Sequence, residues 1–253
     1  MTDLGSAAAR ALACLDLTDL DDACDDAAID ALCRRARTPH GPVAAVCVWP
    51  RFVARCRAAL AGSGIHVATV VNFPSGDEDV IAVRNMTRQA MIDGADEIDM
   101  VVPWRALAAG RPEAVAATVY EVRDAAGRRQ LKAILETGEL KDPALIRSAA
   151  DQAIAGGADF LKTSTGKVAV NATPEAAEIL LAAIRDSGRP VGLKPAGGVR
   201  TTAEAAAYLE LCDRMMGAGW ATPARFRIGA SGLLTALLAT LDGAEAQAGQ
   251  GGY

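Results

Sequence analysis

The segment ADFLKTSTGK (residues 158–167) ends an apolar run on one lysine, then continues with hydroxyl residues, a glycine and a second lysine. Lysine is rare in this chain, which has 26 lysines and arginines in total but only five lysines, at positions 132, 141, 162, 167 and 194. An amine can lose its proton and attack a carbonyl, whereas a guanidinium cannot. The segment therefore indicates lysine chemistry, with chance clustering of a rare residue as the alternative.

Lys162 and Lys194 each close an apolar run, FLK and GLK. An amine at the edge of an apolar core is poorly solvated, and a second ammonium nearby lowers its pKa further. Both effects favour the neutral, nucleophilic amine that Schiff-base formation requires. The alternative is that each lysine reaches solvent or pairs with a carboxylate. Asp99, inside the apolar run EIDMVV, could be the counter-charge and proton-transfer partner of the two lysines, or one half of a structural salt bridge.

Three glycine-containing segments also follow apolar runs: TSTGK (163–167), AGGVR (196–200) and GAS (229–231). Glycine lets a ligand approach backbone N–H groups closely, and barrel enzymes often bind phosphate at such loops. Lys167 and Arg200 could add positive charge. These loops predict a phosphoester substrate, although ordinary turn formation also explains glycines at such positions.

Other polar residues near the ends of these runs remain ambiguous. Cys47 could be a small core residue or a nucleophile. Asp16 and Thr18 could cap a helix or contact a substrate hydroxyl, and Glu136 could pair with a basic neighbour. The two histidines, at positions 40 and 66, fall at a turn and at a strand start and carry no predicted role.

Eight short apolar runs would position these groups, and stretches with helical spacing separate them. Continuous apolar strands alternating with helices predict parallel strands covered on both faces. Eight such units predict an α/β fold, a (β/α)8 TIM barrel with its chemistry at the carboxyl ends of the strands. A doubly wound open sheet is the alternative, but its usual glycine-rich turn does not follow the first strand. The predicted strands are residues 14–17, 43–49, 66–73, 97–102, 131–137, 159–164, 191–196 and 226–231, and the main predicted helices are 77–94, 112–127, 142–156, 174–188 and 202–217.

The 253 residues fit one large domain or two small ones, and we expect a single domain over residues 1–253 with a flexible, Gly-rich tail at about 243–253. The net charge of −5 and the lack of basic blocks argue against nucleic-acid binding. No apolar run approaches a membrane span, and the N-terminus lacks the charge pattern of a signal peptide. The six scattered cysteines predict neither disulfides nor zinc, so a cytoplasmic location is expected.

Taken together, the motifs resemble the deoxyribose-phosphate aldolase family, whose members are class I aldolases on a (β/α)8 barrel. The resemblance extends from Leu15 to Ser231, and its most specific stretches are KTSTGKVAVNATPE and KPAGGVRT. The other matching stretches are LDLT, CVWPRF, TVVNFPSG, ADEIDMVVPWRAL, ETGELKD and FRIGAS. The implied reaction is the reversible cleavage of 2-deoxy-D-ribose 5-phosphate to acetaldehyde and D-glyceraldehyde 3-phosphate, in deoxyribonucleotide catabolism.

The resemblance also implies roles for individual residues. Lys162 matches the Schiff-base lysine, Lys194 the lysine that perturbs it, and Asp99 the aspartate of the proton relay. Asp16 and Cys47 match positions near the aldehyde-binding part of the pocket. The phosphate site is implied at Thr165, Gly166, Lys167, Gly197, Gly198, Gly229 and Ser231, and Tyr253 matches a C-terminal tyrosine that reaches the site in some members. No metal or cofactor is implied, and a homodimer is expected.

The chain departs from the family pattern in two places. Gly232 stands where close relatives often carry a second serine, which puts the affinity for phosphate in doubt. Val102 and Trp104 replace a common Phe and Tyr pair away from the catalytic residues.

Two other functions fit parts of the sequence. A sugar-phosphate epimerase or isomerase on the same barrel would need a carboxylate acid/base pair, often with a metal, and would leave Lys162 unexplained. A non-catalytic sugar-phosphate binder would bind its ligand without forming an imine. Fold alone does not decide among the three functions, but the joint presence of Lys162, Lys194 and Asp99 favours the aldolase.

Overall fold

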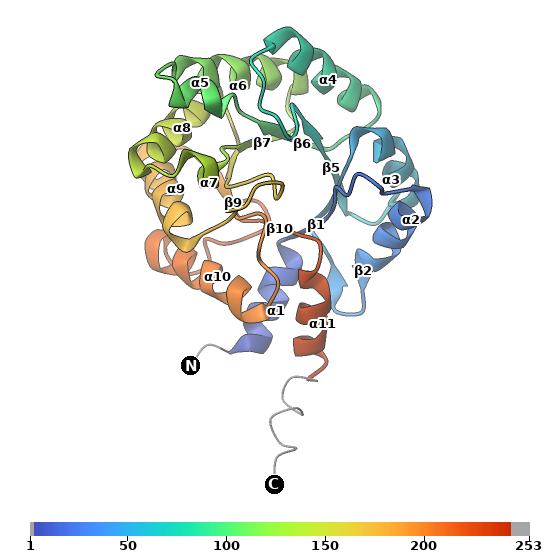
Figure 1. The fold of residues 1–253 in the computed structure, drawn as a ribbon. Helices are drawn as coiled ribbons and strands as arrows, with labels where there is room; N and C mark the ends of the chain where they lie inside the picture. Colours follow the sequence, from blue (N-terminus) through green and yellow to red (C-terminus); the bar gives the residue numbers. More distant parts are fainter. Residues whose placement is uncertain (1–2, 244–253) are drawn as a thin grey trace.

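The computed structural model describes residues 3–243, which form a (β/α)8 barrel (Figure 1). Within these residues, eight parallel strands are hydrogen-bonded in the order β10-β1-β4-β5-β6-β7-β8-β9, and the bridges Leu193–Phe226 and Ala196–Gly229 link β9 to the β10 segment. The strands are β1 Leu15–Asp19, β4 Ala45–Val48, β5 His66–Val71, β6 Glu97–Val101, β7 Gln130–Ile134, β8 Phe160–Lys162, β9 Gly192–Lys194 and β10 Ile228–Ala230.

Helices surround the barrel, and each strand is followed by at least one of them (Figure 1). The helices are α1 Leu4–Ala13, α2 Asp26–Arg35, α3 Val53–Ala59, α4 Val80–Ile92, α5 Trp104–Ala108, α6 Glu113–Ala126, α7 Thr137–Leu140, α8 Pro143–Gly156, α9 Pro174–Ser187, α10 Thr202–Met216 and α11 Leu233–Leu241, with the 3-10 turn η1 Pro50–Phe52.

The predicted fold class and all eight predicted strands are confirmed, as are the five main predicted helices. Side-chain caps start these helices where short polar residues precede them: Asp79 caps α4, and Thr201 with Glu204 forms a capping box on α10. The sequence reasoning did not identify α1, which packs between α10 and α11, or the two-residue ribbon of β2 (Arg37–Thr38) and β3 (Gly41–Pro42).

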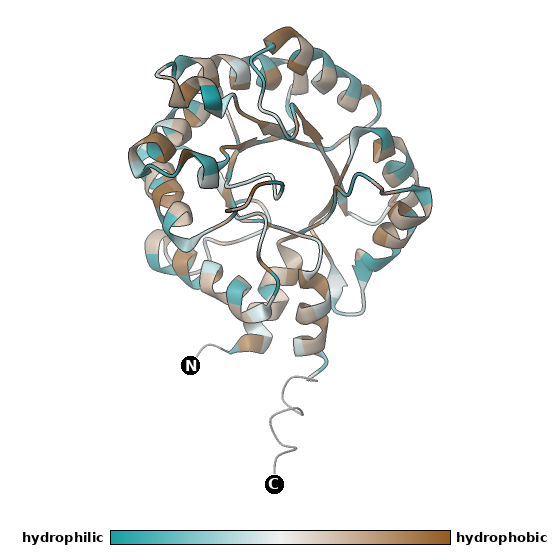
Figure 2. Ribbon diagram, in the orientation of Figure 1, coloured by the Kyte–Doolittle hydropathy of each residue, from teal (hydrophilic) through white to brown (hydrophobic). Residues whose placement is uncertain are grey.

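Strand alternation divides the buried residues into two layers. Side chains such as Ile98, Met100 and Leu131 point outward and join the main core beneath the helices. The barrel interior holds a small apolar cluster that includes Ala45 and Val70, and several fully buried charged side chains lie there as well. In Figure 2, β5 and β6 are brown along most of their length, whereas the helices mix brown and teal. The fold therefore holds ionisable groups inside an apolar wall.

Two further expectations from the sequence concern the C-terminal tail and membrane-spanning segments. Residues 244–253, which include Tyr253 and nearly all of the predicted tail, lie outside the described residues. In residues 3–243, no helix is both long and apolar enough to cross a membrane.

Candidate active site

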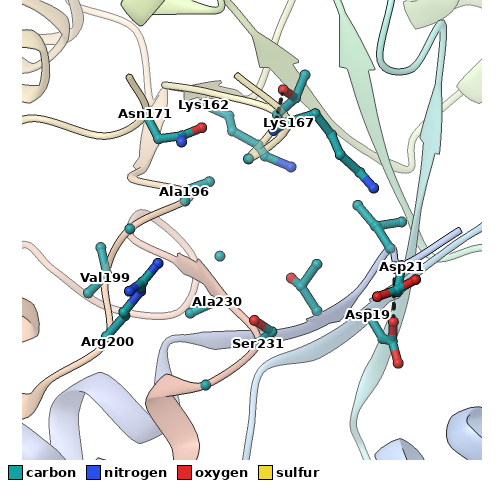
Figure 3. Close-up of a pocket in the computed structure, with 18 of the residues that line it drawn as sticks. Asp19, Asp21, Lys162, Lys167, Asn171, Ala196, Val199, Arg200, Ala230 and Ser231 are labelled. Carbon is teal, nitrogen blue, oxygen red and sulfur yellow. Dashed lines mark hydrogen bonds between the residues drawn. The ribbon is translucent and has the colours of Figure 1, made fainter. Parts of the chain in front are cut away.

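A pocket of about 830 Å³ opens at the carboxyl ends of the strands. Its walls come from the segments that follow β1, β8, β9 and β10, together with part of α2. In Figure 3, the Lys162 amine points into this space, Arg200 and Ser231 lie across from it, and Asp19 and Asp21 occupy another side. Parallel strands bring their carboxyl ends to one rim, which is why segments distant in sequence meet here.

Lys162 is the buried amine that reaches the pocket. It ends β8, where strand alternation turns Leu161 outward to the core and Lys162 inward. Only 3% of Lys162 is exposed, yet it lines the pocket. Its Nζ donates a hydrogen bond to Asp99 Oδ2 at 2.7 Å. A neutral amine can make this bond and still present its lone pair to a ligand.

Asp99 gathers three lysines around one carboxylate. Its Oδ2 accepts hydrogen bonds from Lys162 and Lys194, both at 2.7 Å, and its Oδ1 accepts one from Lys132 at 2.9 Å. Burial by itself would raise the pKa of Asp99, but Lys132, Lys162 and Lys194 outweigh burial and lower this pKa well below its usual range. Asp99 is therefore a carboxylate at neutral pH.

Lys194 lies next to Lys162 in the β8–β9 register but has different surroundings. Its Nζ lies 2.5 Å from Asp16 Oδ2 in addition to its contact with Asp99, and it is fully buried. Burial would lower the pKa of Lys194, but Asp16 and Asp99 reverse that effect and raise it. A Cβ at Gly229 would lie 3.0 Å from Lys194 Cε, so this glycine makes room for the lysine stem.

We use the name charged array for seven buried side chains connected by these contacts: Asp16, Glu97, Asp99, Lys132, Lys162, Lys194 and Arg227. Three carboxylates face four basic groups, so the net charge of the array is zero when one basic group is neutral. Burial lowers the pKa of Lys162, helped by Lys194 and opposed by Asp99. The pKa values of the other three basic groups are raised by their carboxylate partners, which outweigh burial. Of the four basic groups, Lys162 is therefore the one that loses its proton most readily.

Asp16 and Cys47 lie beneath the pocket rather than on its wall. Asp16 is fully buried and accepts a hydrogen bond from Arg227 Nη1 at 2.6 Å. Cys47 Sγ lies 4.0 Å from Asp99 Oδ2, and burial raises the pKa of its thiol. Asp16 belongs to the charged array and Cys47 packs against it, so their expected contact with the aldehyde stays a prediction.

The residues expected at the phosphate site line one wall of the pocket: Thr165, Gly166, Lys167, Gly197, Gly198, Gly229 and Ser231. Gly166 and Gly198 have positive φ, and no atom lies within 4 Å of where their Cβ atoms would stand. A ligand can thus approach the backbone closely. Arg200 lies on the same wall. Helix α11 begins just after Gly232, so no side chain caps its N-terminus. The wall is suited to an anion.

Several residues at the site escaped the sequence reasoning. Lys132, Glu97 and Arg227 complete the charged array, and strand alternation was the signal that could have found them, because Lys132 shares the inward face of β7 with Ile134. Glu136, left open by the sequence, accepts a hydrogen bond from the Thr165 N–H at 3.1 Å. Burial raises the pKa of Glu136.

Comparisons with known proteins agree with this geometry. The model of the DeoC/LacD family aldolases matches residues 10–239. A deoxyribose-phosphate aldolase from Agrobacterium fabrum (strain C58) is 55% identical over 249 residues, which make up 98% of this chain and 96% of that protein. A structure described as a deoxyribose-phosphate aldolase from Toxoplasma gondii superposes with a TM-score of 0.88 at 28% identity, covering 94% of this chain and 95% of that one. A tetrameric deoxyribose phosphate aldolase from Aeropyrum pernix has the same fold, with a TM-score of 0.75 at 22% identity over 94% of this chain and 97% of that one.

Proposed function

The chain belongs to the DeoC/LacD aldolase family and is an aldolase, and we propose that it reversibly cleaves 2-deoxy-D-ribose 5-phosphate into acetaldehyde and D-glyceraldehyde 3-phosphate. The observation that carries this proposal is Lys162, a buried amine that lines the pocket and has a lowered pKa. Such an amine can form an imine with an aldehyde near neutral pH. Lys194 is held by two carboxylates and is the weaker candidate.

The proposed mechanism uses three residues. Neutral Lys162 attacks C1 of the open-chain sugar, and loss of water gives a protonated imine that serves as an electron sink. The pair formed by Asp99 and Lys194 takes the proton of the C3 hydroxyl through water. The C2–C3 bond then breaks, its electrons flow into the imine, and D-glyceraldehyde 3-phosphate leaves. The enamine left on Lys162 gains a proton at its terminal carbon and is hydrolysed to acetaldehyde, which restores the amine.

We assign the phosphate to the glycine-lined wall. Lys167 and Arg200 provide positive charge there, and the start of α11 adds the positive end of a helix dipole. Gly232 has open space at its Cβ position, so the backbone can contact the phosphate directly where a relative's serine would use its hydroxyl. The wall supports a phosphorylated substrate in preference to a neutral sugar.

Imine formation can be tested directly. The protein is incubated with acetaldehyde, reduced with borohydride and mapped by mass spectrometry. We expect a reduced two-carbon adduct on Lys162 and none on Lys194, because Lys162 lines the pocket and Lys194 does not. An adduct separates the aldolase from both an epimerase and a simple binder. A folded protein that remains unmodified would refute the imine mechanism.

Replacing Lys167 with Met should weaken recognition of the phosphate. The side chain lines the pocket, and its nearest carboxylate, on Asp22, is 3.6 Å away and mostly exposed. We expect KM for the phosphorylated sugar to rise about tenfold, which corresponds to about 1.4 kcal/mol for a lost charge-assisted contact. Turnover of unphosphorylated 2-deoxyribose should not change. Lys141→Met, at an exposed position away from the pocket, is the matched control; equal losses for both sugars would argue against a phosphate role.

The predicted homodimer and cytoplasmic location stay predictions. Sedimentation of the purified protein at micromolar concentration would give the oligomeric state.

A further inference from the structure

A line of charged contacts runs from Lys162 through the barrel, away from the pocket. Asp99 contacts Lys162 with one oxygen and Lys132 with the other. The Lys132 amine also donates to Glu97 Oε2 at 2.5 Å. The other oxygen of Glu97 lies 2.7 Å from Nδ1 of His66, at the amino-terminal end of β5. The line therefore joins the pocket to the opposite mouth of the barrel.

Lys132 has no part in the mechanism above, yet it is one of the largest fully buried side chains. It does not line the pocket, and its amine contacts only carboxylates of the charged array, with Asp16 a third neighbour at 3.7 Å. By holding Asp99 Oδ1, it leaves Oδ2 directed at Lys162 and Lys194. Burying such a lysine is costly unless its partners compensate fully.

His66 lies where the line of contacts reaches solvent, because 54% of its side chain is exposed. The charged groups that act on it are Glu97, Arg227 and Asp96. Asp96 is itself paired with arginines on two neighbouring segments, Arg57 and Arg129. The hydrogen bond to Glu97 raises the pKa of His66 above its ordinary value, with burial opposing it. The imidazole therefore keeps its proton to a higher pH than a free histidine side chain does.

We propose that Lys132 is a positioning residue for Asp99, and that Lys132, Glu97 and His66 together couple the charge of Lys162 to the protonation of the opposite mouth of the barrel. This inference rests on the proposed function, since it assigns a second layer of residues to the same reaction.

The sign of the coupling follows from the charge balance. Removing the Lys132 amine leaves three carboxylates against two fixed basic groups, Lys194 and Arg227, so Lys162 must keep its proton to balance the charged array. Removing the Glu97 charge as well leaves two carboxylates facing two fixed basic groups, which restores the balance with a neutral Lys162. A proton on His66 adds positive charge and favours neutral Lys162, whereas its loss has the opposite effect.

The first experiment compares pH profiles of kcat/KM for the wild type, Lys132→Met and the charge-matched variant Lys132→Met/Glu97→Gln. The acidic limb of this profile reports the reactive amine of the free enzyme. We expect Lys132→Met to move that limb toward alkaline pH by about two units, and the double variant to return most of the way. If Lys132 had only a structural role, Lys132→Met would lower the activity without moving the acidic limb of the profile. Identical limbs in the single and double variants would also overturn the proposal.

The second experiment uses His66→Asn, whose amide can still donate to Glu97 but carries no charge. We expect its acidic limb to lie about half a pH unit above that of the wild type, given the screening expected of separated charges. The profiles should coincide at alkaline pH, where the wild-type imidazole is neutral. This surface substitution keeps the proposal testable if Lys132→Met does not fold. Coincident profiles at every pH would overturn the coupling.

Borohydride trapping of acetaldehyde keeps the two proposals apart. An adduct on Lys162 in the wild type, with unshifted limbs in the variants, would refute the coupling and leave the aldolase mechanism standing. A wild type without an adduct would instead refute the mechanism on which the coupling rests.

Discussion

Lys162→Met should reduce cleavage of 2-deoxyribose 5-phosphate by at least about ten-thousandfold, because the substitution removes the nucleophile on which every covalent step depends. Lys194 should not replace it. That amine is fully buried and is held by Asp16 and Asp99, which raise its pKa. Initial rates of aldehyde release, measured at enzyme concentrations high enough to detect the residual activity, would give the size of the loss.

The same variant should fold. Methionine is a neutral side chain of similar length, and it leaves three carboxylates of the charged array facing Lys132, Lys194 and Arg227. We expect a melting temperature close to that of the wild type, with Lys141→Met as the control for a lysine exchange at an exposed position. A folded Lys162→Met protein that retains a tenth of the wild-type activity would rule out Lys162 as the nucleophile.

The barrel could be predicted because its physical signals are local. Each strand lies in a short, mostly apolar run that is buried, and polar caps and glycines mark the helix ends between the runs. Lys162 and Lys194 could be identified for a related reason. An amine at the end of an apolar strand is costly to bury, so its presence there indicates a function. These features can be recognised in the sequence without knowing which strands face each other across the barrel.

The contacts within the charged array could not be predicted, because they depend on distances across the barrel. Glu97 begins β6 and Arg227 lies just before β10, where a charged residue usually faces water, and Lys132 lies in the middle of β7. Their burial follows from the stagger of the closed sheet, which sets Arg227 within 3.1 Å of Glu97 although 130 positions separate them in the chain. His66 had no predicted role for the same reason.

The residues that the resemblance implied for the phosphate site all line the pocket, and their role there stays a prediction. The resemblance also suggested that Asp16 and Cys47 lie near the aldehyde, and the structure buries both, with neither lining the pocket. A sequence motif identifies which residues gather at one end of a barrel. The order in which they lie beneath the surface depends on packing, such as the space that Gly229 leaves for the stem of Lys194.

Asp99→Asn should separate imine formation from carbon–carbon cleavage. The amide keeps the shape of the side chain but cannot accept a proton, so we expect kcat for cleavage to fall by about a thousandfold, within the range of a lost general base. Acetaldehyde trapping on Lys162 should persist, because loss of a neighbouring negative charge favours the neutral amine. Parallel measurement of kcat and of the borohydride adduct would show the two effects in one protein.

Asp99→Asn should also cost stability, because the buried ammonium groups of Lys132 and Lys194 lose a shared counter-charge. Breaking a buried ion pair on one side costs about 3 kcal/mol or more, so the melting temperature should fall on the order of 10 °C for a chain of this size. Adding Lys132→Met leaves Asp16 and Glu97 facing Lys194 and Arg227, and most of the lost stability should return. Cleavage should stay low, since the proton acceptor is still missing. If cleavage recovered together with stability, the role of Asp99 would be structural and another group would have to take the C3 hydroxyl proton.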